Sequence, residues 1–338
     1  MIFLKNDYSL GAHPKVLEAL IETNMTLADG YCEDEFCYSA ADYIRRLVEC
    51  PTAHVHFLPG GTLMNLSALA AFLLRPHWSV ISADTGHICV HETGAIEATG
   101  HKINHVKTPL GKLTPQDIED VMIFHEDEHY VLPKMIYISN STETGLIYTK
   151  AELEALREKC DEHGLYMYID GARIAMALSA EANDVTFPDF ARIADAFYIG
   201  GTKCGAMFGE ALVIVNDDLK EDMRFLIKQR GALLAKGRLM GVQFNTLLKD
   251  NLYLDLGAHA DRMAARLAEG IRAKGYEFVI PPQTNMVFAS FPKPLVKELS
   301  KKVMFETWPA VTETHQAIRL VTSWGTKEEE IDAFLELI

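Results

Sequence analysis

AFYIGGTKCG, residues 196–205, is the most informative stretch of this 338-residue sequence. An apolar, strand-like run ends in two glycines and is followed at once by Thr202 and Lys203. A lysine in this position has little packing role, and the glycines around it let a ligand approach the backbone closely. A desolvated amine at the end of a strand can form an imine with a carbonyl compound. An ordinary solvated lysine in a loop explains this stretch, taken alone, equally well.

Apolar β-branched runs alternate with amphipathic stretches on both sides of this segment. The alternation predicts an α/β fold, with a mostly parallel sheet flanked by helices. The expected strands are HVHFLP (54–59), SVISAD (79–84), KINHV (102–106), KMIYISN (134–140), YMYID (166–170), AFYIGG (196–201) and ALVIVN (211–216). The expected helices are TLMNLSALAAFLL (62–74), TKAELEALREKCDEHG (149–164) and DRMAARLAEGIRAKG (261–275).

The pattern changes near residue 250. Short strands are expected at YEFVI (276–280), NMVFASF (285–291) and AIRLVTSW (317–324), followed by a closing helix, EEEIDAFLEL (328–337). This order predicts a large α/β domain over residues 1–250 and a smaller C-terminal α+β domain over 251–338. No Gly/Ser-rich linker marks the boundary.

A second informative stretch is YMYIDGAR, residues 166–173. Asp170 ends an apolar strand, and open α/β sheets bind their ligands at the carboxyl ends of strands. A carboxylate there could pair with a pyridinium nitrogen and keep that ring an electron sink. Arg173 offers a planar two-pronged donor suited to a carboxylate. Asp170 could equally be a turn or N-cap residue.

A third stretch, FLPGGTLMNLSALAAFL over residues 57–73, places Gly60 and Gly61 between a strand and a helix that begins near Thr62. Backbone N–H groups at a helix N-terminus form an anion site, and glycines leave it uncovered. The stretch matches neither a Walker loop nor a GxGxxG fingerprint, which favours a smaller phosphate over a nucleotide.

In this order, the three stretches resemble the fold-type-I enzymes that depend on pyridoxal 5'-phosphate (PLP). The resemblance implies a PLP-dependent transferase-like fold, with Lys203 holding the cofactor as a Schiff base and Asp170 facing its ring nitrogen. His87, in SADTGHICVHETGA (82–95), is placed to stack on the cofactor ring as an aromatic residue does in that fold. A surface-turn histidine is the alternative reading of His87.

More narrowly, the chain resembles the threonine aldolase/β-eliminating lyase family, which includes the low-specificity L-threonine aldolases. The motifs are Asn6-Asp7-Tyr8-Ser9, the GGT helix start, HICVHETGA (87–95), YIDGAR (168–173), GGTKCG (200–205) and RLVTSWG (319–325). Three departures stand out. Gly60 replaces a usual serine, Asn6-Asp7-Tyr8 replaces Ser-Asp-Thr, and AKGRLMGV (235–242) is a degraded form of a glycine-rich segment.

The resemblance implies roles for particular residues. Those implied to bind the cofactor are Gly60, Gly61, Thr62, His87, Asp170, Arg173, Thr202, Lys203 and Arg238. Those implied to bind substrate are Asn6, Tyr31, Arg173 and Arg319. Lys203 is the implied catalytic lysine, and His87 and His129 are candidates for the base that takes the β-hydroxyl proton. His129 lies in an acidic turn, HEDEHY (125–130), where a purely structural role is the stronger alternative.

The expected activity is cleavage of L-threonine, L-allo-threonine and related β-hydroxy-α-amino acids to glycine and an aldehyde. One alternative is a PLP-dependent β-eliminating lyase acting on cysteine or aromatic amino acids, which would share Lys203, Asp170 and Arg319. A non-catalytic binding protein is a second alternative, although it would have no chemical need for both Lys203 and Asp170. Because Tyr31 lies in a loop that enters the adjoining active site in the family, a homodimer or homotetramer with active sites at the subunit interface is expected.

Composition narrows the partners further. The net charge of −15 argues against a surface for nucleic acid or anionic membranes, which require basic patches. The expected partner is instead a small amino-acid substrate. No apolar run approaches the length needed to cross a bilayer, and six scattered cysteines favour reduced thiols in the cytoplasm. No metal is expected, because His54, His56, His125 and His129 lack ligand-spaced partners.

Overall fold

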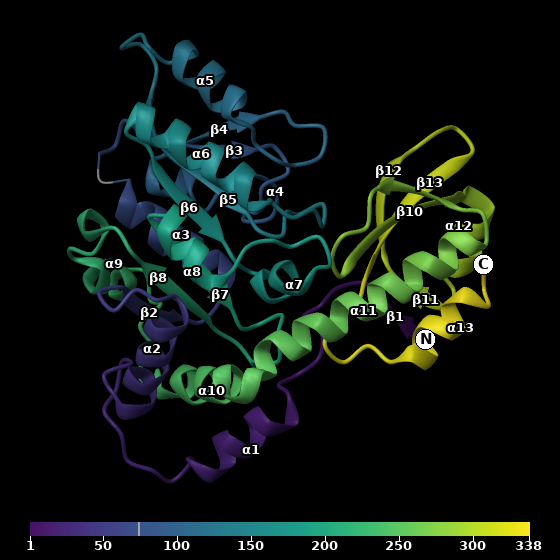
Figure 1. Cartoon of the computed structure of the whole chain (residues 1–338), viewed down its shortest axis with the longest axis horizontal. Coiled ribbons are helices and arrows are strands. Elements are labelled where there is room, and N and C mark those ends of the chain that lie inside the picture. Colours follow the sequence, from purple (N-terminus) through teal and green to yellow (C-terminus); the bar gives the residue numbers. More distant parts are fainter. Residues whose placement is uncertain (74) are drawn as a thin grey trace.

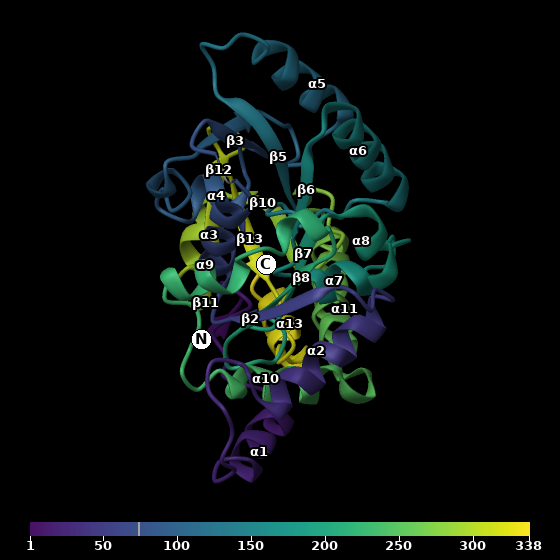
Figure 2. The same cartoon turned by 90° about the vertical axis from the view of Figure 1, so that its left-hand side faces the viewer.

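The computed structural model of the protein describes residues 1–73 and 75–338. Its centre is a seven-stranded sheet with the order β2-β8-β7-β6-β5-β3-β4 (Figures 1 and 2). The strands are β2 (His54–Leu58), β3 (Trp78–Ala83), β4 (Lys102–Val106), β5 (Leu132–Ser139), β6 (Tyr166–Asp170), β7 (Ala196–Gly200) and β8 (Glu210–Ile214). β8 is antiparallel to both of its neighbours, and the other adjacent pairs are parallel. The predicted strands of a mostly parallel sheet are confirmed.

Helices cover both faces of this sheet, because side chains on successive strand positions point to opposite faces. One face packs α3 (Gly61–Phe72), α4 (His87–Val90) and α9 (Met223–Gln229). The other face packs α2 (Glu35–Leu47), α5 (Pro115–Phe124), α6 (Lys150–His163), α7 (Ile174–Ser179), α8 (Phe187–Ile193) and α10 (Arg238–Leu248). The helices predicted over residues 62–74 and 149–164 are confirmed as α3 and α6. Leu74, the last residue of the helix predicted over 62–74, lies outside the described residues.

The smaller part of the molecule is a four-stranded antiparallel sheet with the order β12-β13-β10-β9. Its strands are β9 (Glu277–Ile280), β10 (Met286–Pro292), β12 (Glu306–Ala310) and β13 (His315–Val321), joined by α12 (Lys293–Leu299) and α13 (Glu328–Leu335). This sheet confirms the smaller C-terminal α+β unit of the predicted fold class. The N-terminal β1 (Ile2–Phe3) pairs with β11 (Val303–Met304), so the first residues of the chain pack with this part.

α11 (Leu252–Ala273) runs from the large sheet to the small one (Figure 1). It begins nine positions before the start predicted from the sequence, at 252 and not 261. Gly257 lies in the added stretch, and a Cβ there would come within 2.7 Å of the Ala175 backbone. The glycine therefore lets α11 lie directly against α7, a tertiary contact that periodicity does not reveal.

α1 (Pro14–Glu22) lies at one end of the molecule in both views, where it packs against α10 (Figures 1 and 2). No helix within residues 1–73 and 75–338 is long and apolar enough to cross a membrane. The parallel strands β5, β6 and β7 end on the side that faces α7 and the small sheet (Figure 1).

Candidate active site

Asp170 is buried at the carboxyl end of β6 and is held by hydrogen bonds from neighbouring elements. The hydroxyls of Tyr137 on β5 and Tyr198 on β7 each donate to it at 2.5 Å. The Asn65 amide on α3 donates at 3.1 Å, and the backbone N–H of Ala172 donates at 3.0 Å. Burial alone would raise the pKa of Asp170, but nearby His87 and the tyrosine hydroxyls lower it below its ordinary value. Asp170 is therefore a fixed, ionised carboxylate and not a turn residue.

His87 is joined to Asp170 through a buried polar chain. Its Nδ1 lies 2.8 Å from Oε1 of Glu92, which also accepts a hydrogen bond from Asn65 at 2.8 Å. Burial alone would lower the pKa of His87, but the bond to Glu92 and the charge of Glu143 raise it above its ordinary value. His87 is thus an oriented side chain of the site, and the surface-turn alternative is wrong.

Lys203 lies in the turn that follows β7, as the sequence predicts. None of the residues that the structure describes forms a hydrogen bond or ion pair with its amine. The amine is close enough to Asp7 and His87 to lower the pKa of both. Thr202 uses its hydroxyl within the turn, where Oγ1 accepts a hydrogen bond from the Gly209 backbone at 3.1 Å.

Glu210 lies beneath the same turn, at the start of β8, and it was not singled out from the sequence. Its Oε2 accepts a hydrogen bond from the Gly201 backbone at 2.7 Å. The side chain is 4% exposed, and this burial raises the pKa of Glu210 to about 7. The carboxyl group therefore helps to hold the turn that carries Lys203.

The first turn of α3 begins at Gly61, with Gly60 as its N-cap residue and no side chain capping the helix. A Cβ on Gly60 would meet nothing within 4 Å, whereas one on Gly61 would lie 3.5 Å from the Tyr198 hydroxyl. The helix N-terminus thus opens beside the Asp170 group, with room for an anion and with Thr62 exposed in its first turn. Asp170, His87, Lys203 and the first turn of α3 are called the cofactor side of the site below.

Four charged residues form the opposite side, called the arginine side: Asp7, Glu143, Arg173 and Arg319. Arg173 is buried and donates to Asp7 with two prongs, from Nε at 2.7 Å and from Nη2 at 3.1 Å. This pair occupies the Nε–Nη2 edge of Arg173, and the predicted role of Arg173 in binding a substrate carboxylate stays a prediction. Arg319 on β13 is different, because its Nε is buried and has no acceptor among the described residues.

Glu143 was missed by the sequence reasoning. It is 8% exposed in the loop after β5, and its Oε2 lies 3.9 Å from Nη1 of Arg173. A signal was available, because Glu143 follows β5 much as Asp170 ends the adjacent β6. The carboxyl ends of neighbouring parallel strands meet at one edge of a sheet.

The structure does not bring four of the predicted residues into this site. Asn6 accepts hydrogen bonds from Tyr8 and Ser9 in an exposed local turn, while the adjacent Asp7 enters the site. His129 is a correction: it is 83% exposed, bonds to Asp127, and precedes the amino end of β5, whereas the site lies at the carboxyl end. Its acidic turn connects α5 to the amino end of β5, away from the carboxyl ends where the site lies.

Tyr31 and Arg238 are the other two. The ring of Tyr31 lies 4.1 Å from the Lys228 amine, near α9. The guanidinium of Arg238 donates to the carbonyl oxygens of Thr23 and Asn24, just beyond α1. Neither lies beside Lys203 in its own subunit, so their predicted roles at a neighbouring subunit's cofactor stay predictions.

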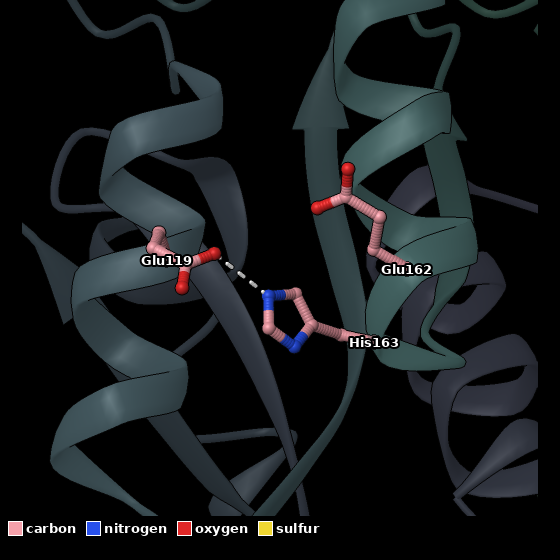
Figure 3. Close-up of side chains that lie close together, drawn as sticks. All are labelled: Glu119, Glu162 and His163. Atoms are coloured by element: carbon pink, nitrogen blue, oxygen red, sulfur yellow. Dashed lines mark hydrogen bonds and ion pairs between the residues drawn. The ribbon is translucent and has the colours of Figure 1, made fainter.

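A separate polar cluster lies between α5 and α6, where Glu119, Glu162 and His163 come together (Figure 3). His163 bonds to Glu119 at 2.9 Å. The Lys159 ammonium donates to Glu119 at 3.1 Å and to Glu162 at 2.5 Å. Lys159 bridges the two carboxylates and His163 contacts one of them, so this partly exposed cluster is an ion-pair network. The predicted absence of a metal is not tested by it.

Comparison with known proteins identifies the family. Residues 11–293 match the model of the beta-eliminating lyase family. The chain is 33% identical over 333 residues to the low specificity L-threonine aldolase of Pseudomonas aeruginosa, covering 97% of this chain and 94% of that protein. The structure of Leishmania major threonine aldolase superposes with a TM-score of 0.98 at 49% identity, covering 100% of this chain and 98% of that one. An aspartate aminotransferase from Thermus thermophilus shares the fold alone, with a TM-score of 0.74 at 17% identity, covering 100% of this chain and 90% of that one.

The residues of the cofactor side fit PLP, the cofactor of this family. Lys203 presents an amine without a protein partner, and Asp170 presents a buried negative charge suited to a protonated ring nitrogen. The uncapped start of α3, open at Gly60, suits a phosphate, and His87 is oriented by Glu92. From the sequence match, the fold and this fit, we conclude that the chain belongs to the beta-eliminating lyase family and is a PLP-dependent lyase.

Proposed function

We propose that this protein cleaves L-threonine, L-allo-threonine and related β-hydroxy-α-amino acids to glycine and an aldehyde. The observation that carries the proposal is the full-length likeness to proteins named as threonine aldolases from Pseudomonas aeruginosa and Leishmania major. β-Elimination from cysteine or aromatic amino acids is not favoured by these relatives, although the family model alone would allow it.

The arginine side would determine which bond of the substrate breaks. Nε of Arg319, which has no partner among the described residues, is a suitable donor for the substrate carboxylate. Arg173 is held by its hydrogen bonds to Asp7 and forms the adjacent part of the site. A carboxylate held there would orient the substrate so that its Cα–Cβ bond is the one that breaks. Holding the reacting bond in place is worth about 7–11 kcal/mol in the best cases. PLP supplies the electron sink that accepts the bonding pair at Cα.

The cofactor side prepares this chemistry before substrate arrives. Lys203 is the attachment point of the cofactor and the amine that substrate displaces. Asp170 keeps the ring nitrogen protonated because its own negative charge is fixed by four donors. The glycines at the start of α3 and Thr202 bind the phosphate end, and His87 covers the ring.

The active protein is proposed to be a homodimer or homotetramer with active sites at the subunit interface. Exposed apolar side chains gather on α1, on the loop after it and on α9, where a second copy would cover them: Leu17, Ile21, Met25, Leu27, Tyr31 and Phe225. Burial of such a surface is the main driving force of subunit association. Tyr31 and Arg238 would reach the partner's cofactor from this region. The site of action is proposed to be the cytoplasm.

The deciding experiment supplies the purified holoenzyme with L-threonine, L-allo-threonine and phenylserine. Glycine should appear in amounts equal to acetaldehyde or benzaldehyde, and we expect both C3 epimers of threonine to react. L-Serine and L-cysteine serve as the controls for elimination. Pyruvate and ammonia formed from either of them faster than glycine forms from any β-hydroxy substrate would replace the aldolase with a β-eliminating lyase.

A further inference from the structure

Glu143 has no role in the activity described so far, although it lies inside the site. The turn that carries it is fixed by hydroxyl groups on either side of it. Thr142 accepts a hydrogen bond from the Leu146 backbone at 3.0 Å, and Thr144 donates to the Leu110 carbonyl at 2.6 Å. Thr284, next to the small sheet, donates to the Gly145 carbonyl at 2.9 Å. A turn anchored from three directions fixes the backbone from which the Glu143 side chain extends.

The surroundings of this carboxylate show where it points. Its Oε2 lies 3.9 Å from Arg173. Its charge contributes to the raised pKa of His87 and opposes the lowering, by burial, of the pKa of His91 and of Arg319. These groups come from α4, β13 and the loop after β6, so the carboxylate is central to the site. No side chain or backbone group in the described ranges donates a hydrogen bond of ordinary length to it. It is therefore an acceptor with capacity to spare, beside the arginine proposed to bind the substrate carboxylate.

The other acceptors near the arginine side are less suited to taking a proton from substrate. Asp7 is occupied by Arg173 and by the Asn285 amide. Nδ1 of His87 is already engaged by Oε1 of Glu92, at 2.8 Å. His129 lies at the other edge of the sheet. His91 is exposed, and its ring centroid is 5.4 Å from that of His87, so it is the one competitor the experiment must separate.

We propose that the Glu143 carboxylate is the catalytic residue that accepts the β-hydroxyl proton of the amino-acid substrate. The inference rests on the proposed function. As the O–H bond breaks, its electron pair becomes the second bond of the aldehyde carbonyl. The Cα–Cβ bond breaks at the same time and leaves its pair at Cα, delocalised into the cofactor. Cα then takes up one proton as glycine forms, and Glu143 releases the one it gained, so the overall reaction neither consumes nor produces protons.

The test compares two reactions of the same site in Glu143→Gln. Cleavage of L-threonine needs a β-hydroxyl base, whereas exchange of a glycine α-proton with deuterated solvent needs only the cofactor, Lys203 and the carboxylate site. Glutamine keeps the shape but not the basicity of glutamate. Cleavage should fall on the order of 10²–10⁴-fold. Glycine exchange, followed by proton NMR, should stay within about twofold of wild type, as a change that touches neither reacting atom would leave it.

His91→Asn is the matched control, because it removes the neighbouring imidazole and leaves Glu143 in place. It should keep cleavage within about twofold. Unchanged cleavage in Glu143→Gln, or an equal loss of cleavage and exchange with cofactor still bound, would overturn the role of Glu143. A large loss in His91→Asn alone would transfer the role to His91.

Glu143→Asp provides a second variant if the glutamine protein does not fold or retain cofactor. It keeps the charge beside Arg173 but withdraws the carboxylate by one methylene. We expect at least a tenfold loss of cleavage with exchange unchanged, in the lower part of the range for a misplaced base. Cleavage at the wild-type rate would contradict the proposal. If wild type exchanges glycine protons but cleaves no β-hydroxy amino acid, the proposed function itself is wrong, an outcome distinct from failure of Glu143.

Discussion

On the cofactor side, four donors converge on Asp170, whereas on the arginine side the buried Nε of Arg319 has no acceptor among the described residues. The same contrast separates the two arginines. Arg173 donates two hydrogen bonds to Asp7, and its charged form is favoured by that partner. Burial and the charge of Arg173 lower the pKa of Arg319. Asp170 and the Asp7–Arg173 pair thus have their partners within the protein, whereas Nε of Arg319, like the Lys203 amine on the cofactor side, has none among the described residues.

This difference has an energetic meaning. A buried polar group without a partner costs about 1–3 kcal/mol, and a ligand that supplies the partner recovers that cost on binding. Groups that already have partners within the protein, such as Asp170 and Arg173, recover no such cost when substrate binds, but they hold their neighbours in place. We therefore expect changes on the cofactor side to abolish chemistry, and changes at Arg319 to weaken substrate binding while the fold survives.

The largest effect should come from Lys203→Ala. The change removes the residue proposed to bind the cofactor covalently and takes away no core packing, so turnover should fall by several orders of magnitude while the circular dichroism spectrum is retained. Borohydride treatment of wild type should fix the cofactor to a peptide containing Lys203. A reduced adduct mapped to another lysine would show that Lys203 does not hold the cofactor.

The two arginines should separate in a paired experiment. Arg319→Ala should cost about 2–5 kcal/mol in kcat/KM for all β-hydroxy substrates together, with an unchanged melting temperature. Arg173→Ala leaves Asp7 buried and unpaired, so it should cost about 3–5 kcal/mol in the free energy of unfolding. Thermal unfolding and steady-state kinetics on both variants give the comparison. Equal losses of stability would show that Arg319 is as much a structural residue as Arg173.

Glu210 allows the cofactor side to be tested through pH. Its pKa rises from 4.5 to about 7 on folding, so the folded protein binds its proton more tightly than the unfolded chain does. The resulting stability is fully present below pH 4.5 and is lost as the pH rises through about 7. A shift of this size corresponds to about 3 kcal/mol. Glu210→Gln should remove that pH dependence, because glutamine does not titrate.

Urea unfolding of both holoenzymes at pH 5, 6, 7 and 8 measures this difference. Wild type should lose stability relative to Glu210→Gln across the interval, since all other titrating groups are common to the two chains. Parallel curves would mean that Glu210 is ionised throughout and that burial does not govern its protonation.

The smallest effect is expected at His129, which belongs to neither side. His129→Asn changes an exposed ring on the far edge of the sheet, so both kcat/KM and stability should change by no more than about 0.5 kcal/mol. Steady-state kinetics with L-threonine is the measurement. A substantial loss of cleavage would mean that His129 reaches the site of another subunit, and the single-chain geometry would then be an incomplete guide.

The division of the chain at residue 250 remains a proposal, and the structure adds one fact to it. The first residues pair with β11 in the smaller part, so that part is built from both ends of the sequence. Limited proteolysis near residue 250 of the holoenzyme would show whether the two parts separate there.

The sequence by itself predicted the order of strands along the chain, the fold class and, through the resemblance to fold-type-I PLP enzymes, the residues of the cofactor side. The positions of these residues are local features, because Asp170 ends an apolar strand and the start of α3 and Lys203 each come after one. Strand ends of this kind can be read from periodicity and glycines. Only the tertiary structure decided the arginine side. Its four residues come from distant parts of the chain. No spacing therefore reveals that Arg173 bonds to Asp7 while Nε of Arg319 has no partner among the described residues. Charges separated along the chain acquire partners only when folding brings them together and excludes water.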